Sequence, residues 1–180
     1  MSTRCRIRLA DLGDLDAFSD HVIRHSAESG KEGSVHFAIS RTPARPSVRD
    51  SARQRWERSI DEALWGRTFV LIEPQGKIVG HLELRGGRFP SEMHRAVLGM
   101  GIERAHTKQG HGARLIETAI AWAHASTRLT WIDLGVFEHN APARKLYKRM
   151  GFIENGVRQD AFRIDAGIAV TDISMALRLR

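Results

Sequence analysis

The hydrophobic residues of this chain follow two spacings, which separate predicted strands from predicted helices. Apolar residues at alternate positions, or in short apolar runs, are typical of strands, whereas recurrence every three to four residues is typical of an amphipathic helix. The strand pattern predicts strands over residues 6–9, 68–72, 77–84, 95–102, 128–136, 152–157 and 168–179. The helix pattern predicts helices over residues 11–25, 48–64, 112–125 and 140–150.

The order of these elements predicts the fold class. Along the chain come a strand, two helices, a meander of three strands, a helix, a strand, a helix and two closing strands. A meander combined with crossover units gives a mixed sheet with helices on its faces, which is an α/β or α+β architecture. The length of 180 residues fits a single domain over residues 1–180.

Two features interrupt this regular pattern. Residues 26–47 are rich in Gly, Ser and Pro and predict a loop, and loops of this length in a compact domain are often functional. Gly99 and Gly101 lie inside the strand predicted over residues 95–102. Glycines in a strand interior predict either a bulge or a ligand that lies close to the backbone.

Composition narrows the class of protein without choosing a function. The hydrophobic fraction of 42% excludes a disordered polymer, and the single Cys excludes a disulfide-stapled scaffold. No apolar run is long enough for a membrane-spanning helix or a signal peptide, so we expect a cytoplasmic protein without a membrane partner. The net charge of +7 favours an anionic partner such as a phosphate, a nucleic acid or an acidic protein.

Residues 107–113, with the sequence T-K-Q-G-H-G-A, stand between a predicted strand and a predicted helix. Glycines at such a place let the backbone approach a ligand, and the helix that follows offers unpaired N–H groups with partial positive charge. This combination is typical of phosphate or pyrophosphate sites, although a simple turn at the start of a helix has the same pattern. The segment lacks both the Walker motif and the dinucleotide fingerprint.

Residues 140–152, with the sequence N-A-P-A-R-K-L-Y-K-R-M-G-F, form a second segment of interest. Asn140 is suited to cap the predicted helix, and Gly151 is suited to end it. Tyr147, the only Tyr in the chain, is seven residues from Asn140 and shares its helix face. Taken alone, each of these residues has an ordinary structural explanation.

Together, the two segments resemble the GNAT superfamily of acyl-CoA-dependent N-acetyltransferases. Residues 109–112 resemble its R/Q-x-x-G-x-G/A pyrophosphate loop, and residues 140–152 match its N-x-x-A-x-x-L-Y-x-x-x-G-F segment. Thr107 departs from the Arg or Gln usual at the first loop position. The resemblance covers essentially the whole chain. It implies a mixed, mostly antiparallel sheet of about seven strands with about four helices, in which a splayed strand pair forms the acyl-CoA cleft.

The resemblance also implies an enzyme that transfers an acetyl group from acetyl-CoA, its co-substrate, to a primary amine by direct attack in a ternary complex. Residues 100–103 would pair with the pantetheine arm, and an N–H near Ile102 would polarise the thioester. Tyr147 would give its proton to the departing CoA thiolate. The implied cofactor-binding residues are Met100, Ile102, Thr107, Lys108, Gln109, Gly110, His111, Gly112, Ala113 and Asn140.

The attacking amine must first lose a proton, because a lysine-like amine has a pKa of about 10.4. We expect Glu103, at the end of the splayed strand, to act as the general base, with Glu83, Glu138 and His139 as alternatives. A solvated or salt-bridged carboxylate is the ordinary alternative for each of these acids.

The acceptor and the partners stay open at this level. A protein N-terminus and a small-molecule amine are both compatible with the sequence, and we expect residues 26–47 to lie on the acceptor side. A homodimer is a further possibility. No metal is expected, because His21 and His25 share a helix face without a third ligand nearby. A non-catalytic acyl-CoA-binding module and a basic nucleic-acid-binding protein are the alternative functions.

Overall fold

The computed structural model describes residues 4–38, 43–125, 128–164 and 167–179. These residues form a single seven-stranded sheet with the order β1-β2-β3-β4-β5-β7-β6. The strands are β1 (Arg6–Leu9), β2 (Gly66–Ile72), β3 (Ile78–Gly86), β4 (Arg95–Ile102), β5 (Trp131–Phe137), β6 (Ile153–Ile164) and β7 (Ile168–Arg178). Every neighbouring pair is antiparallel except β4 and β5, which are parallel. The mixed, mostly antiparallel sheet expected from the sequence is confirmed.

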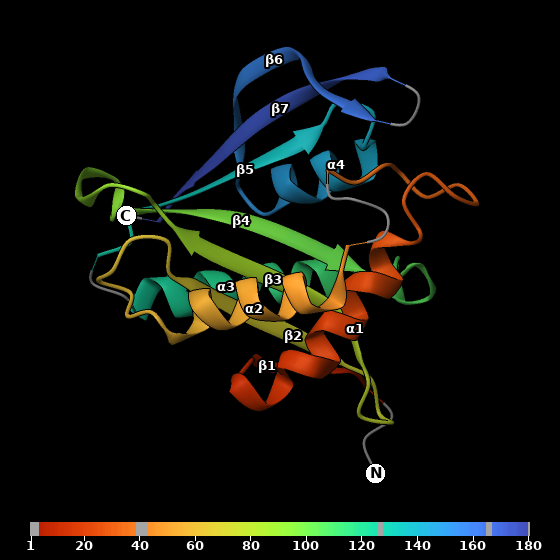
Figure 1. Cartoon of the computed structure of the whole chain (residues 1–180). Helices are drawn as coiled ribbons and strands as arrows, with labels where there is room; N and C mark the ends of the chain where they lie inside the picture. The colour runs from red at the N-terminus through yellow and green to blue at the C-terminus, as the bar shows by residue number, and fades with distance from the viewer. Residues whose placement is uncertain (1–3, 39–42, 126–127, 165–166, 180) are drawn as a thin grey trace.

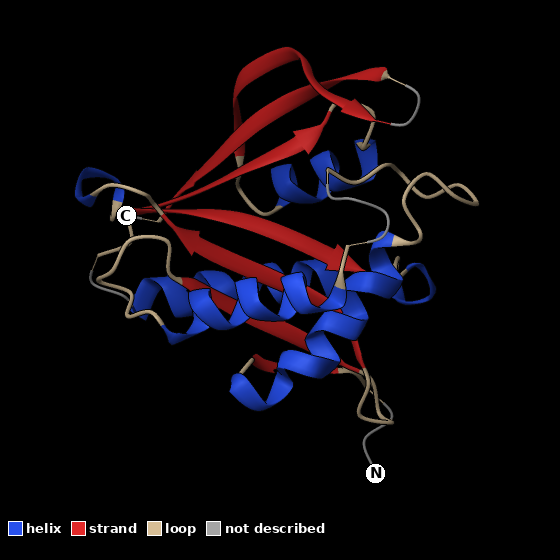
Figure 2. Ribbon diagram, viewed as in Figure 1, coloured by secondary structure: helices blue, strands red, loops and turns tan. Residues whose placement is uncertain are grey.

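Four α-helices cover the sheet. They are α1 (Leu15–Ser26), α2 (Arg45–Glu57), α3 (His111–Ala125) and α4 (Ala141–Arg149). Helices α1 and α2 lie on one face of the sheet and α3 on the opposite face (Figure 1). Helix α4 lies beside β5, where the blue end of the chain turns back as the β6–β7 hairpin (Figures 1 and 2).

Both faces of strand β2 are buried, which explains why its sequence is a continuous apolar run rather than an alternating one. Phe69 and Leu71 belong to the larger hydrophobic cluster together with α3 residues. Val70 and Ile72 belong to the smaller cluster, which contains Phe18 of α1. The sheet is therefore the middle layer of a three-layer structure, and burial on both faces holds α1 and α3 in place.

The helix predicted over residues 48–64 is α2, and its predicted end is wrong. The helix stops at Glu57 because the next residue is extended (φ −71°, ψ 142°). The N–H of Ser59 donates to Oε2 of Glu62 at 2.5 Å and starts a separate turn. Leu64 is exposed instead of continuing the apolar stripe of the helix. The prediction ran too far because apolar residues keep a helical spacing in the sequence beyond Glu57, where the chain instead forms a turn held by side-chain hydrogen bonds.

The strand predicted over residues 152–157 is also longer than expected. Strand β6 continues to Ile164 and pairs with β7, with register shifts between residues 154 and 156 and between residues 158 and 162. Most of its side chains are exposed, so the apolar pattern carried little information about where it ends.

The glycines of β4 have different surroundings, although the ladder between β3 and β4 is regular through both, so no bulge is present. A Cβ at Gly101 would lie 2.6 Å from the ring of His25 and 2.9 Å from that of His81. A Cβ at Gly99 would meet only the guanidinium of Arg85, at 3.8 Å. The close approach expected at Gly101 is therefore made by the protein's own histidines.

We expect Gly101→Ala to lower the free energy of unfolding by about 1–3 kcal/mol, because the added methyl group must displace two packed imidazoles. Urea unfolding followed by circular dichroism measures this change. Gly99→Ala is the matched control and should change the unfolding free energy by much less. Equal effects of the two substitutions would contradict the packing described here.

Candidate active site

Strands β4 and β5 pair over a short stretch and then separate. The paired residues are Arg95 with Trp131, Ala96 with Ile132 and Val97 with Asp133. A cavity of about 540 Å³ lies where the strands part, lined by residues 97–100 of β4 and 135–137 of β5. Its other walls come from α1, α2, β3, α4 and residues 36–38. The splayed strand pair implied by the resemblance is therefore present.

The cavity brings together residues that lie far apart in the sequence. Met100 of β4 and Tyr147 of α4 both line it, and so does Asn140, which precedes α4. Ile102 and residues 107–113 are not among its lining residues. The predicted set thus divides into a group in the cavity wall and a group in the loop before α3.

The loop over residues 107–113 has the backbone of an anion-binding turn. Lys108 and Gly110 are both left-handed, with φ of 59° and 79°, and α3 begins at His111. Thr107 Oγ1 donates to the carbonyl of Arg104 at 2.8 Å, which secures the start of the loop. Consecutive N–H groups at such a turn and at a helix N-terminus form a concave site that favours anions.

Gly112 connects this loop to α4. A Cβ at Gly112 would lie 2.9 Å from Cδ2 of Leu146 and 3.6 Å from Cε of Met100. A side chain at this position would require Leu146 to shift, whereas the distance to Met100 is an ordinary van der Waals contact. The loop before α3, the parted strand β4 and helix α4 therefore meet at one point, although 34 residues separate Gly112 from Leu146 (146 − 112).

Asn140 and Tyr147 have the local geometry that the sequence predicts. Oδ1 of Asn140 accepts the N–H of Ala143 at 3.2 Å and caps α4, so its carboxamide nitrogen is the polar group that this cap does not use. The ring of Tyr147 packs edge-on against Phe152. Burial raises the pKa of Tyr147 to about 12, which keeps its hydroxyl protonated at neutral pH.

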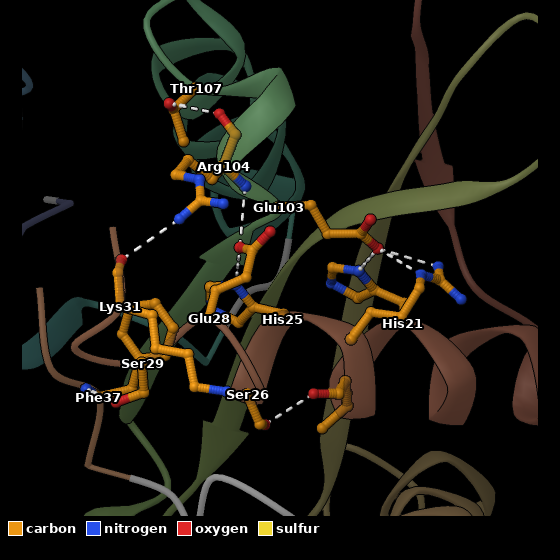
Figure 3. Close-up of polar contacts among 12 residues, drawn as sticks. His21, His25, Ser26, Glu28, Ser29, Lys31, Phe37, Glu103, Arg104 and Thr107 are labelled. Carbon is orange, nitrogen blue, oxygen red and sulfur yellow. Dashed lines mark hydrogen bonds and ion pairs between the residues drawn. The ribbon is translucent and has the colours of Figure 1, made fainter. Parts of the chain in front are cut away.

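Glu103 is held by cations rather than facing the cavity. Its Oε1 lies 2.9 Å from Nδ1 of His21 and accepts a hydrogen bond from Nε of Arg24 at 3.0 Å. Figure 3 shows the carboxylate turned toward His21 of α1. Burial alone would raise the pKa of Glu103, but the hydrogen bonds from His21 and Arg24 lower it to about 2. Glu103 is not among the residues that line the cavity, so its carboxylate has no direct contact with an amine bound there.

The alternative bases occupy different positions. Glu83 lines the cavity, where Nε of Arg55 donates to its Oε1 at 2.7 Å and Nε of Arg85 lies 3.7 Å from its Oε2. Glu138 and His139 follow β5 and are not among the lining residues. The ring of His139 instead packs near Phe137.

The residues of the cavity wall that were not among the predicted site residues include His25, Arg55, His81 and Arg85. One signal was available, because residues 81, 83 and 85 alternate with apolar neighbours and must share one face of their strand. What the sequence could not show is that α1 and α2 pack over this face.

The loop after α1 is tied to the end of β4. The N–H of Arg104 donates to Oε2 of Glu28 at 2.9 Å, and Glu28 lies between Arg104 and His25 in Figure 3. The guanidinium of Arg104 contacts Glu32 at 2.5 Å and so contributes little positive charge to the neighbouring loop. Residues 36–38 of the loop predicted over residues 26–47 line the cavity, and residues 39–42 lie outside the described residues. The predicted end of this loop is wrong, because residues 45–47 already belong to α2.

The family is decided by comparison with known proteins. The model of the Acetyltransferase (GNAT) family matches residues 36–152, which is more than half of the chain. The chain belongs to the GNAT acetyltransferase family. This confirms the resemblance carried by residues 109–112 and 140–152.

Three relatives illustrate the similarity. The chain is 30% identical over 154 residues to the L-amino acid N-acetyltransferase AaaT of Escherichia coli (strain K12), covering 81% of this chain and 91% of the relative. A GNAT-family acetyltransferase from Streptococcus pneumoniae has the same fold, with a TM-score of 0.83, 22% identity and coverage of 97% and 99% of the two chains. The yncA acetyltransferase of Salmonella typhimurium, solved with its cofactor acetyl-CoA, aligns with a TM-score of 0.79, 18% identity and coverage of 98% and 94%.

The structure of this GNAT protein also bears on metal binding and on membrane spans. Among the residues that the structure describes, no group of three His, Cys, Asp or Glu side chains is arranged to hold a metal ion. Within the same residues, no helix is both long enough and apolar enough to cross a membrane.

We expect the free energy of unfolding to depend on pH in a way that reflects the lowered pKa of His25. Burial lowers the pKa of His25 to about 4 from its ordinary value of 6.5. Between these pH values the unfolded chain binds the extra proton, so the free energy of unfolding falls as the pH is lowered from 6.5 to 4. One such group contributes at most about 1.4 kcal/mol per pH unit.

We expect His25→Gln to make this fall less steep in urea unfolding at a series of pH values. His94→Gln, at an exposed His, is the control and should leave the slope unchanged. An unchanged slope in His25→Gln would show that His25 is not held neutral in the folded protein.

Proposed function

We propose that this GNAT protein transfers an acetyl group from acetyl-CoA to the primary amine of a small acceptor that carries a carboxylate, by direct attack in a ternary complex. The observation that carries the proposal is the single cavity that runs from the parted strands β4 and β5 to the face covered by α1 and α2. A cavity of about 540 Å³ is of the size that small-molecule sites have. The size favours a small amine over a protein N-terminus.

The loop before α3 and the parted strands fit acetyl-CoA in different ways. A Cβ at Gly110 would meet nothing within 4 Å, so there is open space over the loop for a diphosphate. Lys108, Gln109, His111 and Ala113 would add backbone N–H groups or charge on either side of it. The edge of β4 that β5 leaves unpaired, from Met100 to Ile102, would bond the pantetheine arm together with the carboxamide of Asn140.

Once the acceptor ammonium has lost its first proton, the acetyl transfer needs two further proton transfers. The amine attacks the thioester carbon, and the C–S bond breaks as the hydroxyl of Tyr147 gives its proton to sulfur. The new amide nitrogen loses its surplus proton, which returns to the Tyr147 oxygen. The hydroxyl of Tyr147 stays protonated at neutral pH, so a proton is at hand when the C–S bond breaks. Its place in the cavity wall favours catalysis over a binding module without activity.

The charges of the cavity favour an acceptor with a carboxylate. Arg55 and Arg85 both point to one carboxylate, Glu83, so the wall retains a net positive charge. Guanidinium groups bind carboxylates in bidentate geometry. The similarity to an L-amino acid N-acetyltransferase supports the same acceptor class. We therefore favour an L-amino acid as the acceptor.

The ion pairs of helix α2 bear on the nucleic-acid alternative. The arginines of α2 pair with carboxylates of the protein itself: Arg45 with Asp20, Arg49 with Asp16, Arg53 with Glu57 and Arg55 with Glu83. A basic helix face neutralised in this way offers less charge to a phosphate backbone than the sequence alone indicates.

Two other expectations remain predictions. A homodimer would use the free edge of β6, where Ile153 and Val157 expose about 73% and 67% of their surfaces. Sedimentation tests the dimer, and microscopy of a tagged protein in cells tests the cytoplasmic location.

We expect CoA release from acetyl-CoA with members of a panel of the twenty standard L-amino acids, and weaker release with their amides and with a peptide N-terminus. Arg85→Gln should raise KM for the amino acid about 10-fold or more and leave KM for acetyl-CoA unchanged, because a hydrogen bond to a charged group contributes about 1.5–3 kcal/mol. Arg88→Gln, at an exposed arginine of the following turn, is the control. Equal activity on acids and amides would contradict the carboxylate site.

We expect Tyr147→Phe to lower kcat by about 10²-fold, since the general acid is lost while the ring and its packing against Phe152 remain. Isothermal titration should find acetyl-CoA binding unchanged. Full turnover in the variant would remove Tyr147 from the proton transfer.

A further inference from the structure

A continuous series of hydrogen bonds runs from the interior to the cavity through Glu103, His21 and His81. Oε1 of Glu103 lies 2.9 Å from Nδ1 of His21, and Nε2 of His21 lies 2.9 Å from Nδ1 of His81. Helix α1, strand β3 and the end of β4 each supply one member. Glu103 and His21 are buried, whereas His81 is half-buried and lines the cavity.

The donor and the acceptor of each of these hydrogen bonds follow from the charge of Glu103, which lies at the buried end. Glu103 is ionised and can only accept, so Nδ1 of His21 must carry a proton. Burial lowers the pKa of His21 in spite of its hydrogen bond to Glu103, which favours a neutral ring whose Nε2 accepts. Nδ1 of His81 must then be the donor, and Nε2 of His81 is left with a lone pair.

The ring of His81 is held in one orientation by its neighbours. Phe18 meets it edge-on at 5.4 Å between ring centroids, and the bare backbone of Gly101 lies beneath it. The other titratable or charged groups near it are His25 of α1, Arg55 of α2 and Arg85 of its own strand. Burial above all, together with the charges of Arg85 and Arg55, holds the pKa of His81 well below its ordinary value, so the ring is neutral at neutral pH.

We propose that His81 is the general base of the acetyl transfer and that Glu103, acting through His21, is a positioning residue. This inference rests on the proposed function. The acceptor ammonium gives one proton to Nε2 of His81, as the Nδ1 proton of His81 moves to Nε2 of His21. The positive charge then rests on His21 beside the Glu103 carboxylate, and the amine is left with the lone pair that attacks the thioester.

Replacing His81 should lower kcat by a factor that depends on pH. We expect His81→Gln to lower kcat about 10²-fold near neutral pH with the best L-amino acid of the panel, and the loss should shrink as the pH approaches the pKa of the amine. At that pH the amine loses its proton to water without help. Acetyl-CoA binding should be unchanged, and His94→Gln should behave as the wild type. No loss, or an equal loss at every pH, would overturn the assignment.

A separate measurement tests the positioning role of Glu103. Glu103→Gln removes the negative charge that stabilises a protonated histidine, so the acid limb of the kcat profile should move to lower pH and its plateau should fall. KM for the amino acid should change little. A profile that keeps its position would show that Glu103 has only a structural role.

Nitrogen NMR of the histidine rings separates failure of this inference from failure of the proposed function. In ¹⁵N-labelled protein we expect neutral His21 and His81, each with its proton on Nδ1, whether or not any amine is acetylated. A protonated His21, or His81 with its proton on Nε2, would overturn the relay. An enzyme without turnover on the amino-acid panel would overturn the proposed acceptor and leave the ring tautomers to decide the relay.

Discussion

The separation of β4 from β5 after three residue pairs is the constraint on which the rest of the site depends. Backbone groups at a parted strand edge lack the partners that a ladder would supply, and such groups are costly to leave unsatisfied. An extended, amide-bearing ligand satisfies them in the way that a strand would. The opening also gives side chains of α1, α2 and β3 access to the same space as Tyr147 of α4.

The cavity is kept open by contacts at its two ends. At one end, Gly112 lets the start of α3 pack against Leu146 of α4, which holds α4 on the far side of the gap. At the other end, Gly101 lets His25 and His81 pack onto β4. A side chain at either glycine would change the distance between elements that the site needs at fixed positions.

Charge is distributed so that little of the net positive charge is left unopposed near α1 and α2. Arginines of α2 are paired with acidic groups on α1 and β3, and the guanidinium of Arg104 is paired with Glu32. Exposed ion pairs of this kind add little stability. Their effect is to orient α2 and the loop after α1, which both line the cavity, and to leave the pair Arg55 and Arg85 with one shared carboxylate.

The sequence by itself determined the order of elements, the mixed sheet, the cap at Asn140 and the glycine loop before α3. These are local features, since hydrophobic spacing and turn residues act over a few positions. It predicted less well where α2 and β6 end, because a side-chain turn at Ser59 and the pairing of β6 with β7 override local spacing.

Only the tertiary structure decided which residues share the cavity and what their protonation states are. Glu103 was the expected base, yet its ion pair with Arg24 and its bond to His21 depend on α1 packing over the end of β4. His81 joins that cluster through a contact across 60 residues of sequence. Burial and hydrogen-bond partners set a pKa, and both are properties of contacts between distant segments that no local pattern records.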